Sequence, residues 1–157
     1  MPQIQKIRPF LWFDSQAREA AHFYCSVFPN SRILREVVLP STPSGKVEII
    51  DFELAGLRFQ SMSAGPLYRF TEAISFVVTC DSQQEIDHFW SHLSAHPTAE
   101  ACGWCKDPFG VSWQIVPAVL PDLMSNASPD ALARLMQVML PMKKLEIAPL
   151  QNAARNV

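Results

Sequence analysis

The chain carries two copies of one motif, and this internal repeat constrains its fold more than any other feature. LWFDSQAREAAHFY (11–24) and VVTCDSQQEIDHFW (77–90) both place Asp-Ser-Gln after an apolar run and His-Phe-aromatic further on. A second pair closes each copy, GLRFQSM (56–62) and GVSWQIV (110–116), with the pattern Gly-x-x-aromatic-Gln. Because both motifs recur in the same order, we expect two similar structural modules.

The repeat makes residues of the two copies equivalent. Asp14 matches Asp81 at an offset of 67 positions, whereas Gln60 matches Gln114 at an offset of 54. The second copy has therefore lost about thirteen residues between its helix and its last strand.

Each copy is predicted to form a strand, a helix and then further strands. Apolar residues recur at helical spacing, which predicts one buried face for each helix: Ala17, Ala20, Ala21, Tyr24 and Phe28 in the first, and Ile86, Phe89, Trp90 and Leu93 in the second. Ser82 and Glu85 form a capping-box pattern at the start of the second helix. The first copy is therefore a β-α-β-β-β module and the second a shortened one, which makes the fold class α+β.

Residues 118–157 have no counterpart in the repeat. A helix is predicted to begin after Ser128 as N-cap, with Pro129 at its first position. The segment after that helix is predicted to be an arm that packs either on the domain or on a second subunit. We expect one domain over 1–157, with modules at 4–66 and 72–117.

Composition excludes several classes of partner. A net charge of −2 without any Lys/Arg cluster argues against nucleic acid. No apolar run is long enough for a signal peptide or a membrane span, so a soluble cytoplasmic protein is expected. The 4 cysteines are few for 157 residues, which favours reduced thiols over a disulfide framework.

Side chains alternate between the two faces of a strand, so the repeat sorts them into two sets. The set expected beneath the helices is Ile74, Phe76, Val78, Cys80, Leu57, Phe59, Ser61, Val111, Trp113 and Ile115. The set expected on the opposite face is Arg8, Phe10, Trp12, Arg58, Gln60, Met62, Ser75, Val77, Thr79, Ser112, Gln114 and Val116. Polar side chains on the uncovered face suggest a ligand-lining surface. The alternative is that the two glutamines are half-exposed strand residues bonded to their neighbours.

These patterns resemble a known superfamily. The paired modules and DPFGVSWQI (107–115) resemble the vicinal oxygen chelate proteins, which include glyoxalase I, bleomycin-resistance proteins and ring-cleaving dioxygenases. Four stretches resemble its PhnB-like branch, also called the 3-demethylubiquinone-9 3-methyltransferase family. They are FLWFDSQAREAAHFYCSVFPNS, AISFVVTCDSQQEIDHFW, CGWCKDPFGVSWQIVP and MKKLEIAPL. The resemblance implies curved sheets around a cavity, often in a dimer.

The resemblance also implies where a metal would bind. Metal-using relatives place ligands on the first and last strand of each module, which here correspond to Arg8 or Ile7, Ser75 or Ile74, Gln60 and Gln114. None of these residues is His or Glu, so we expect no metal or other cofactor. If a metal is present, Gln60 and Gln114 would be two of its ligands. Methyl transfer from S-adenosylmethionine is not expected either, because the 5 glycines form no Gly-rich strand-to-helix turn.

Three other groups of residues resemble functional sites, but their surroundings favour other roles. Cys102 and Cys105 have no second ligand pair for zinc, and the residues after them predict a turn into a strand rather than a redox helix. His88, His92 and His96 are predicted to stack along the solvent side of the second helix. Asp51 and Glu53 lie on the uncovered face by the same alternation, where salt bridges to Arg8 or Arg58 are expected rather than acid/base roles.

The leading prediction is a homodimeric protein that binds a small, partly apolar molecule. Its expected ligand-binding residues are Arg8, Trp12, Gln60, Met62, Thr79 and Gln114. Arg8 would hold an anionic group, Trp12 would stack on the ligand, and the glutamines would orient its polar atoms. The alternatives are a divalent-metal-dependent enzyme of the glyoxalase or dioxygenase kind, and a dimeric interaction module that uses the C-terminal segment.

Overall fold

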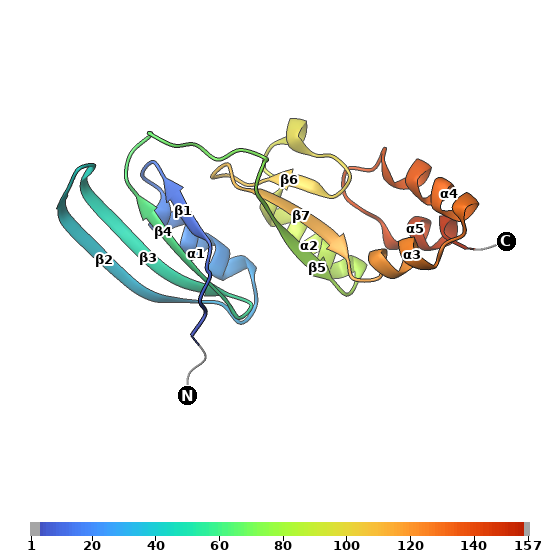
Figure 1. The fold of residues 1–157 in the computed structure, drawn as a ribbon, viewed down its shortest axis with the longest axis horizontal. Coiled ribbons are helices and arrows are strands. Elements are labelled where there is room, and N and C mark those ends of the chain that lie inside the picture. Colours follow the sequence, from blue (N-terminus) through green and yellow to red (C-terminus); the bar gives the residue numbers. More distant parts are fainter. Residues whose placement is uncertain (1–3, 156–157) are drawn as a thin grey trace. The chain divides into compact units, whose positions relative to one another are not determined.

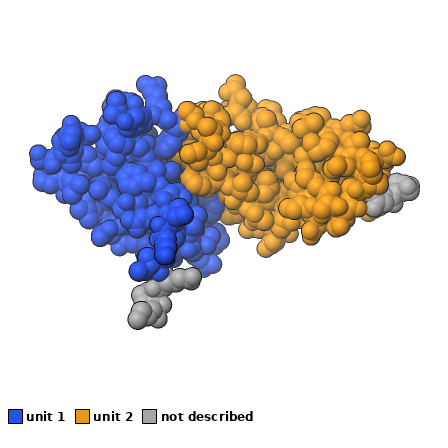
Figure 2. All heavy atoms as spheres, viewed as in Figure 1, with its two compact units in different colours: residues 1–70 blue, residues 71–157 orange. Residues whose placement is uncertain are grey.

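The computed structural model describes residues 4–155, which divide into two compact units (Figure 2). The first unit spans residues 1–70 and the second 71–157. Each contains one copy of the repeat, and each is described by itself below. In the described part of the chain, every helix is too short or too polar to cross a bilayer.

The first unit is a four-stranded sheet with one helix (Figure 1). Its elements are β1 (Phe10–Phe13), α1 (Ala17–Val27), β2 (Arg32–Thr42), β3 (Gly45–Leu54) and β4 (Leu57–Ser63). The strand order is β1-β4-β3-β2, with β1 and β4 parallel and the other neighbours antiparallel. The predicted β-α-β-β-β module is confirmed.

The second unit repeats this topology with one strand fewer. It contains β5 (Ser75–Cys80), α2 (Gln83–Leu93), the 3₁₀ turn η1 (Pro97–Ala99), β6 (Trp104–Lys106) and β7 (Ser112–Pro117). The order is β5-β7-β6, with β5 and β7 parallel. Phe10 pairs with Gln60 in the first sheet, and Val77 pairs with Gln114 in the second. The equivalence of the two glutamines is thus confirmed, and the lost residues correspond to β2.

Each helix covers one face of its own sheet. Tyr24 of α1 stacks on Phe52, and Phe52 stacks on Phe59, at centroid distances of 6.3 and 5.3 Å. Ile86, Phe89 and Leu93 are the buried residues of α2. The predicted helix-covered set is mostly correct, but Ile74 precedes β5 and is 74% exposed, and Leu57 is 45% exposed at the start of β4.

Hydrogen bonds to side-chain hydroxyl groups stabilise the N-termini of α1 and α2. Ser82 accepts a hydrogen bond from the Glu85 N–H at 3.1 Å, as the capping box predicts. The side chain of Gln16, at the N-cap of α1, makes no cap bond; instead the Ser63 hydroxyl of β4 accepts from the Ala17 N–H at 2.9 Å. The first helix is therefore capped by the sheet on which it packs.

The C-terminal segment forms three helices: α3 (Leu120–Asn126), α4 (Pro129–Met139) and α5 (Ile147–Ala153). The N-cap of α4 is Ser128, as predicted, and its hydroxyl accepts from the Ala131 N–H at 3.2 Å. Five buried residues of this segment form one apolar cluster: Leu135, Met139, Leu145, Leu150 and Ala154.

The arm after α4 packs against the rest of the second unit, which is the first of its two predicted alternatives. The Cys102 and Gly103 N–H groups donate to the carbonyls of Met142 and Lys143 at 2.7 and 2.8 Å. Gln83 holds the next turn, since its amide donates to the Leu145 carbonyl at 3.1 Å and accepts from the N–H of Ile147, the first residue of α5, at 2.8 Å.

The predicted placement of His96 is also wrong. His96 was expected on the second helix, but α2 ends at Leu93 and His96 precedes η1. The chain leaves the helix at Ser94, whose backbone is extended. His88 and His92 do stack, with ring centroids 4.6 Å apart, and both are exposed to solvent as predicted.

Candidate functional site

The face of the first sheet opposite α1 carries rows of aligned side chains. One row crosses all four strands and consists of Phe10, Gln60, Asp51 and Arg35. On one side of it lies a charged row of Arg58, Glu53 and Arg32, and on the other a mainly apolar row of Trp12, Met62, Ile49 and Val37. The predicted alternation is confirmed for β1 and β4.

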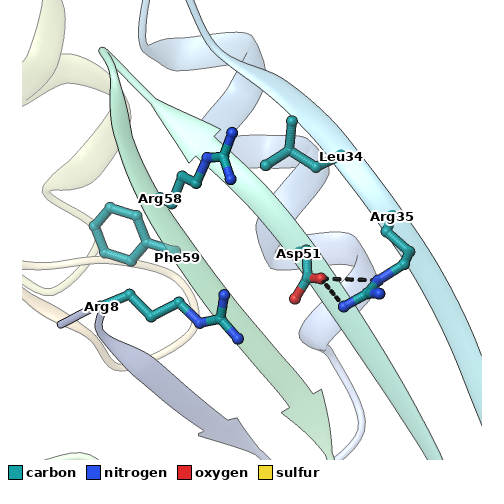
Figure 3. Close-up of a pocket in the computed structure, with 6 residues that line it drawn as sticks. All are labelled: Arg8, Leu34, Arg35, Asp51, Arg58 and Phe59. Atoms are coloured by element: carbon teal, nitrogen blue, oxygen red, sulfur yellow. Dashed lines mark hydrogen bonds and ion pairs between the residues drawn. The ribbon is translucent and has the colours of Figure 1, made fainter. Parts of the chain in front are cut away.

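A hollow lies over the charged part of this face (Figure 3). Its volume is about 320 Å³, and its lining residues are Arg8, Leu34, Arg35, Asp51, Arg58 and Phe59. Leu34 sits at a register shift in β2, between Ile33 and Arg35. Because a bulge inserts one extra residue, it places Arg35 on the same face as Asp51.

The arginines around the hollow differ in how they are paired. Arg35 donates to Oδ2 of Asp51 through Nε at 2.9 Å and Nη2 at 2.5 Å. The other oxygen of Asp51 accepts from Nε2 of Gln60 at 2.6 Å. The Nε atom of Arg58 lies 3.7 Å from Oε2 of Glu53, and the Nε atom of Arg32 lies 3.7 Å from Oε1 of the same carboxylate. Arg8 makes no hydrogen bond or ion pair with another residue among 4–155.

This pairing leaves the hollow positively charged. Its lining includes three arginines, at positions 8, 35 and 58, and one carboxylate, that of Asp51, in a chain whose net charge is −2. Of the two predicted salt bridges, Glu53 does pair with Arg58, whereas Asp51 pairs with Arg35 instead of Arg8 or Arg58. Among the three arginines that line the hollow, Arg8 and Arg58 therefore have more unused donors than Arg35.

The structure brings only part of the predicted site together within the first unit. Arg8 lines the hollow, whereas Gln60 is half-buried and bonds to Asp51, which is one of the lining residues. Trp12 and Met62 lie one row further along the sheet. The indole N–H of Trp12 donates to the Gly65 carbonyl at 2.8 Å, and its ring packs edge-to-face with that of Tyr68 at a centroid distance of 4.9 Å. The predicted stacking partner of a ligand is thus already in contact with the chain itself.

The other two predicted residues belong to the second unit. Thr79 is exposed, and Gln114 is half-buried with its Nε2 at 2.9 Å from the Ser75 hydroxyl. Both glutamines are therefore hydrogen-bonded to neighbours, as the alternative interpretation states; their contact with a ligand stays a prediction. The second module does not carry the same charged residues as the hollow of the first. Ser75, Trp104 and Ser112 occupy the positions equivalent to Arg8, Asp51 and Arg58.

The Cys-x-x-Cys stretch has a structural environment. Cys102 and Gly103 have φ values of 52° and 87°, typical of a two-residue hairpin turn. Burial raises the pKa of Cys105 to about 12, with Asp107 and Glu100 adding to the shift, and burial also raises the pKa of Cys102. Thiols with raised pKa values are poor nucleophiles at neutral pH.

Asp107 is a buried residue whose role the sequence reasoning missed. Its carboxylate accepts from the N–H groups of Phe109 and Val111 at 2.8 and 3.0 Å, and from the indole N–H of Trp113 at 2.8 Å. It therefore holds the turn that leads into β7. The signal in the sequence was an Asp directly before a Pro in a turn that also contains a Gly.

The sequence model of the 3-demethylubiquinone-9 3-methyltransferase family matches residues 5–116. The chain belongs to this family. The PhnB protein of Bacillus cereus is 32% identical, with a TM-score of 0.60 over 73% of this chain and 100% of the other. Protein PA1353 of Pseudomonas aeruginosa is 18% identical, with a TM-score of 0.54 over 73% of this chain and 98% of the other. No curated protein sequence matches the chain significantly.

A more distant structure agrees on the fold. FosX, a fosfomycin resistance protein of Listeria monocytogenes, is 13% identical, with a TM-score of 0.53 over 79% of this chain and 99% of the other. The predicted membership of the PhnB-like branch and the vicinal oxygen chelate fold are both confirmed. The family match ends at residue 116, so α3, α4 and α5 lie beyond it.

Proposed function

We propose that this PhnB-like protein binds a small anionic molecule in the hollow on the first sheet. The observation that carries the proposal is the unequal pairing of the arginines. Arg35 is held by Asp51, whereas Arg8 makes no ion pair within residues 4–155 and Arg58 has only a loose one. Guanidinium groups with spare donors bind carboxylate and phosphate oxygens well.

Size and apolar contacts fit a small organic anion. A hollow of about 320 Å³ is within the range of small-molecule sites. Leu34 lines it and is 37% exposed, and Phe10, 48% exposed, follows Arg8 on the same face of the sheet. The anionic group would meet the arginines, while the apolar part of the ligand would cover these side chains.

The residues present do not fit a divalent metal, so we propose binding without one. Gln60 directs its amide nitrogen at Asp51, and both oxygens of Asp51 already accept hydrogen bonds. The guanidinium groups of Arg8 and Arg58 would repel a cation at this place, and neutral amide oxygens are weak ligands. Family membership alone does not supply the missing imidazole or carboxylate ligands.

The proposal is tested by removing one positive charge at a time. Arg8→Gln and Arg58→Gln would each weaken the binding of benzoate or inorganic phosphate about tenfold or more, because each removes a charge-assisted hydrogen bond. Arg69→Gln is the matched control, since Arg69 is exposed in the same unit and outside the hollow. NMR titration of the full chain measures the affinities. Equal affinities for all three variants would refute the proposal.

Metal content is tested separately. Mass spectrometry of untagged protein before and after dialysis against chelator is expected to find no stoichiometric divalent metal. About one metal per chain that disappears in Gln60→Ala plus Gln114→Ala would contradict the proposal and favour a glyoxalase-type or dioxygenase-type enzyme. The homodimer expected from the sequence stays a prediction, which sedimentation of the same sample would check.

A further inference from the structure

The side-chain amide of Gln60 has a fixed polarity. Its Nε2 atom lies 2.6 Å from Oδ1 of Asp51. An ionised carboxylate can only accept hydrogen bonds, so the amide nitrogen, not the amide oxygen, must face it. The polarity therefore follows from the chemistry of the pair, whichever way the two similar amide atoms are assigned.

Asp51 is in turn held in place by Arg35. The Nε atom of Arg35 donates to Oδ2 at 2.9 Å, so each carboxylate oxygen has its own donor. Arg35, Asp51 and Gln60 form a hydrogen-bonded chain across three adjacent strands, β2, β3 and β4. A rotation of the Gln60 amide would break its bond to Asp51 and set two acceptors against each other.

The amide oxygen of Gln60 is left as an open acceptor. Within residues 4–155, the only hydrogen bond of this side chain is the one from its nitrogen to Asp51. Gln60 lies two residues after Arg58 on β4, and alternation puts both on the face opposite α1. The face thus presents cationic donors from Arg8 and Arg58 beside one neutral acceptor.

The equivalent glutamine of the second module has no such constraint. Nε2 of Gln114 lies 2.9 Å from the hydroxyl of Ser75. A hydroxyl both donates and accepts, so either orientation of that amide can form a hydrogen bond. The fixed polarity comes from Asp51, which is replaced by Trp104 at the equivalent position of the second sheet.

We infer that the ligand of this site is an oxyanion that also carries a hydroxyl or amino donor, and that the donor binds the amide oxygen of Gln60. This inference rests on the proposed function, because it assumes that Arg8 and Arg58 hold the anionic group. Asp51 is then a positioning residue, since it acts on the ligand only through Gln60. A ligand without a donor would cover the amide oxygen and leave it unpaired, which weakens binding.

The test compares ligands that differ only in the donor. Each of the three hydroxybenzoate isomers is titrated into the full chain beside its methoxybenzoate counterpart, with benzoate as reference. For at least one isomer the hydroxy compound should bind about tenfold more tightly than the methoxy compound, since the latter keeps the oxygen but cannot donate. Equal affinities in all three pairs would overturn the inference.

Variants then test whether Gln60 and Asp51 cause the preference for hydroxy over methoxy compounds. Gln60→Leu removes the acceptor and should bring the hydroxy-to-methoxy affinity ratio close to one. Asp51→Asn lets the new amide donate to Gln60, so the Gln60 nitrogen is free to turn outward; the ratio should then fall close to one, because hydroxyl and methoxy oxygens can both accept from that nitrogen. The ratio is the readout because the lost negative charge of Asp51→Asn strengthens the binding of every oxyanion. Gln137→Leu, at an exposed position of α4, is the matched control and should keep the wild-type ratio.

Failure of the inference is distinguishable from failure of the proposed function. If Arg8→Gln weakens every benzoate but the hydroxy and methoxy compounds bind equally, anion binding stands and the role of Gln60 is refuted. A preference that survives both Gln60→Leu and Asp51→Asn would also refute it. If Arg8→Gln and Arg58→Gln change no affinity, or if no oxyanion binds, the proposed function fails and the inference fails with it.

Discussion

Gly103 is the residue at which one added methyl group should be most informative. Its φ is +87°, and a Cβ there would lie 3.0 Å from the Ile115 carbonyl oxygen and 3.0 Å from Cδ1 of Leu145. Gly56 has the same φ of +87°, but a Cβ there would have nothing within 4 Å. Gly103→Ala and Gly56→Ala therefore introduce the same backbone strain. Only Gly103→Ala also forces the new methyl group against neighbouring atoms.

The two costs can be estimated separately. A non-glycine residue in the left-handed region costs about 1–2 kcal/mol, which both variants bear. The effect of alanine on the unfolded chain is also common to both. Forcing a methyl group against a backbone oxygen and a packed leucine costs a further 1–3 kcal/mol, roughly. We expect a loss of about 1–2 kcal/mol for Gly56→Ala and about 2–5 kcal/mol for Gly103→Ala.

Urea unfolding gives the free energies, and hydrogen exchange read by mass spectrometry shows where each variant opens. Because Leu145 belongs to the docked arm, Gly103→Ala should raise exchange over residues 142–150, whereas Gly56→Ala should not. If Gly103→Ala costs no more than Gly56→Ala and leaves that exchange unchanged, the close approach of the arm to this turn does not contribute to stability.

Three further perturbations follow from the second unit. Asp107→Asn should cost about 1–3 kcal/mol in urea unfolding, because one of three buried donors, such as the Trp113 indole, loses its acceptor; an unchanged midpoint would contradict this. The pKa of Cys105 is raised from 9.0 to about 12, so the unfolded chain ionises first and stability should fall as pH rises from about 9 to 12. Cys105→Ala should reduce that pH dependence without abolishing it, because burial also raises the pKa of Cys80 to about 12. Leu150→Ala should cost about 2–5 kcal/mol, since Leu150 is fully buried in the C-terminal cluster; a loss near zero would mean that α5 packs only loosely.

The sequence by itself determined the modular topology and most of the face assignment. Both rest on local signals: the offsets between Asp14 and Asp81 and between Gln60 and Gln114 required a shortened second module, and a period of two residues sorted the strands. These signals need no knowledge of distant contacts. The same is true of the α4 start at Ser128, where side-chain chemistry next to the helix decides the boundary.

Only the tertiary structure decided which side chains meet. The bulge at Leu34 shifts Arg35 onto the face of Asp51, and an alternation rule applied to β2 without the bulge would place it on the other face. Tyr68 packs on Trp12, and Met142 reaches the turn at Cys102, from segments far away in the sequence. Such contacts depend on which segments lie side by side in the folded chain. The orientation of the Gln60 amide and the unpaired charge of Arg8 therefore cannot be derived from the sequence pattern alone.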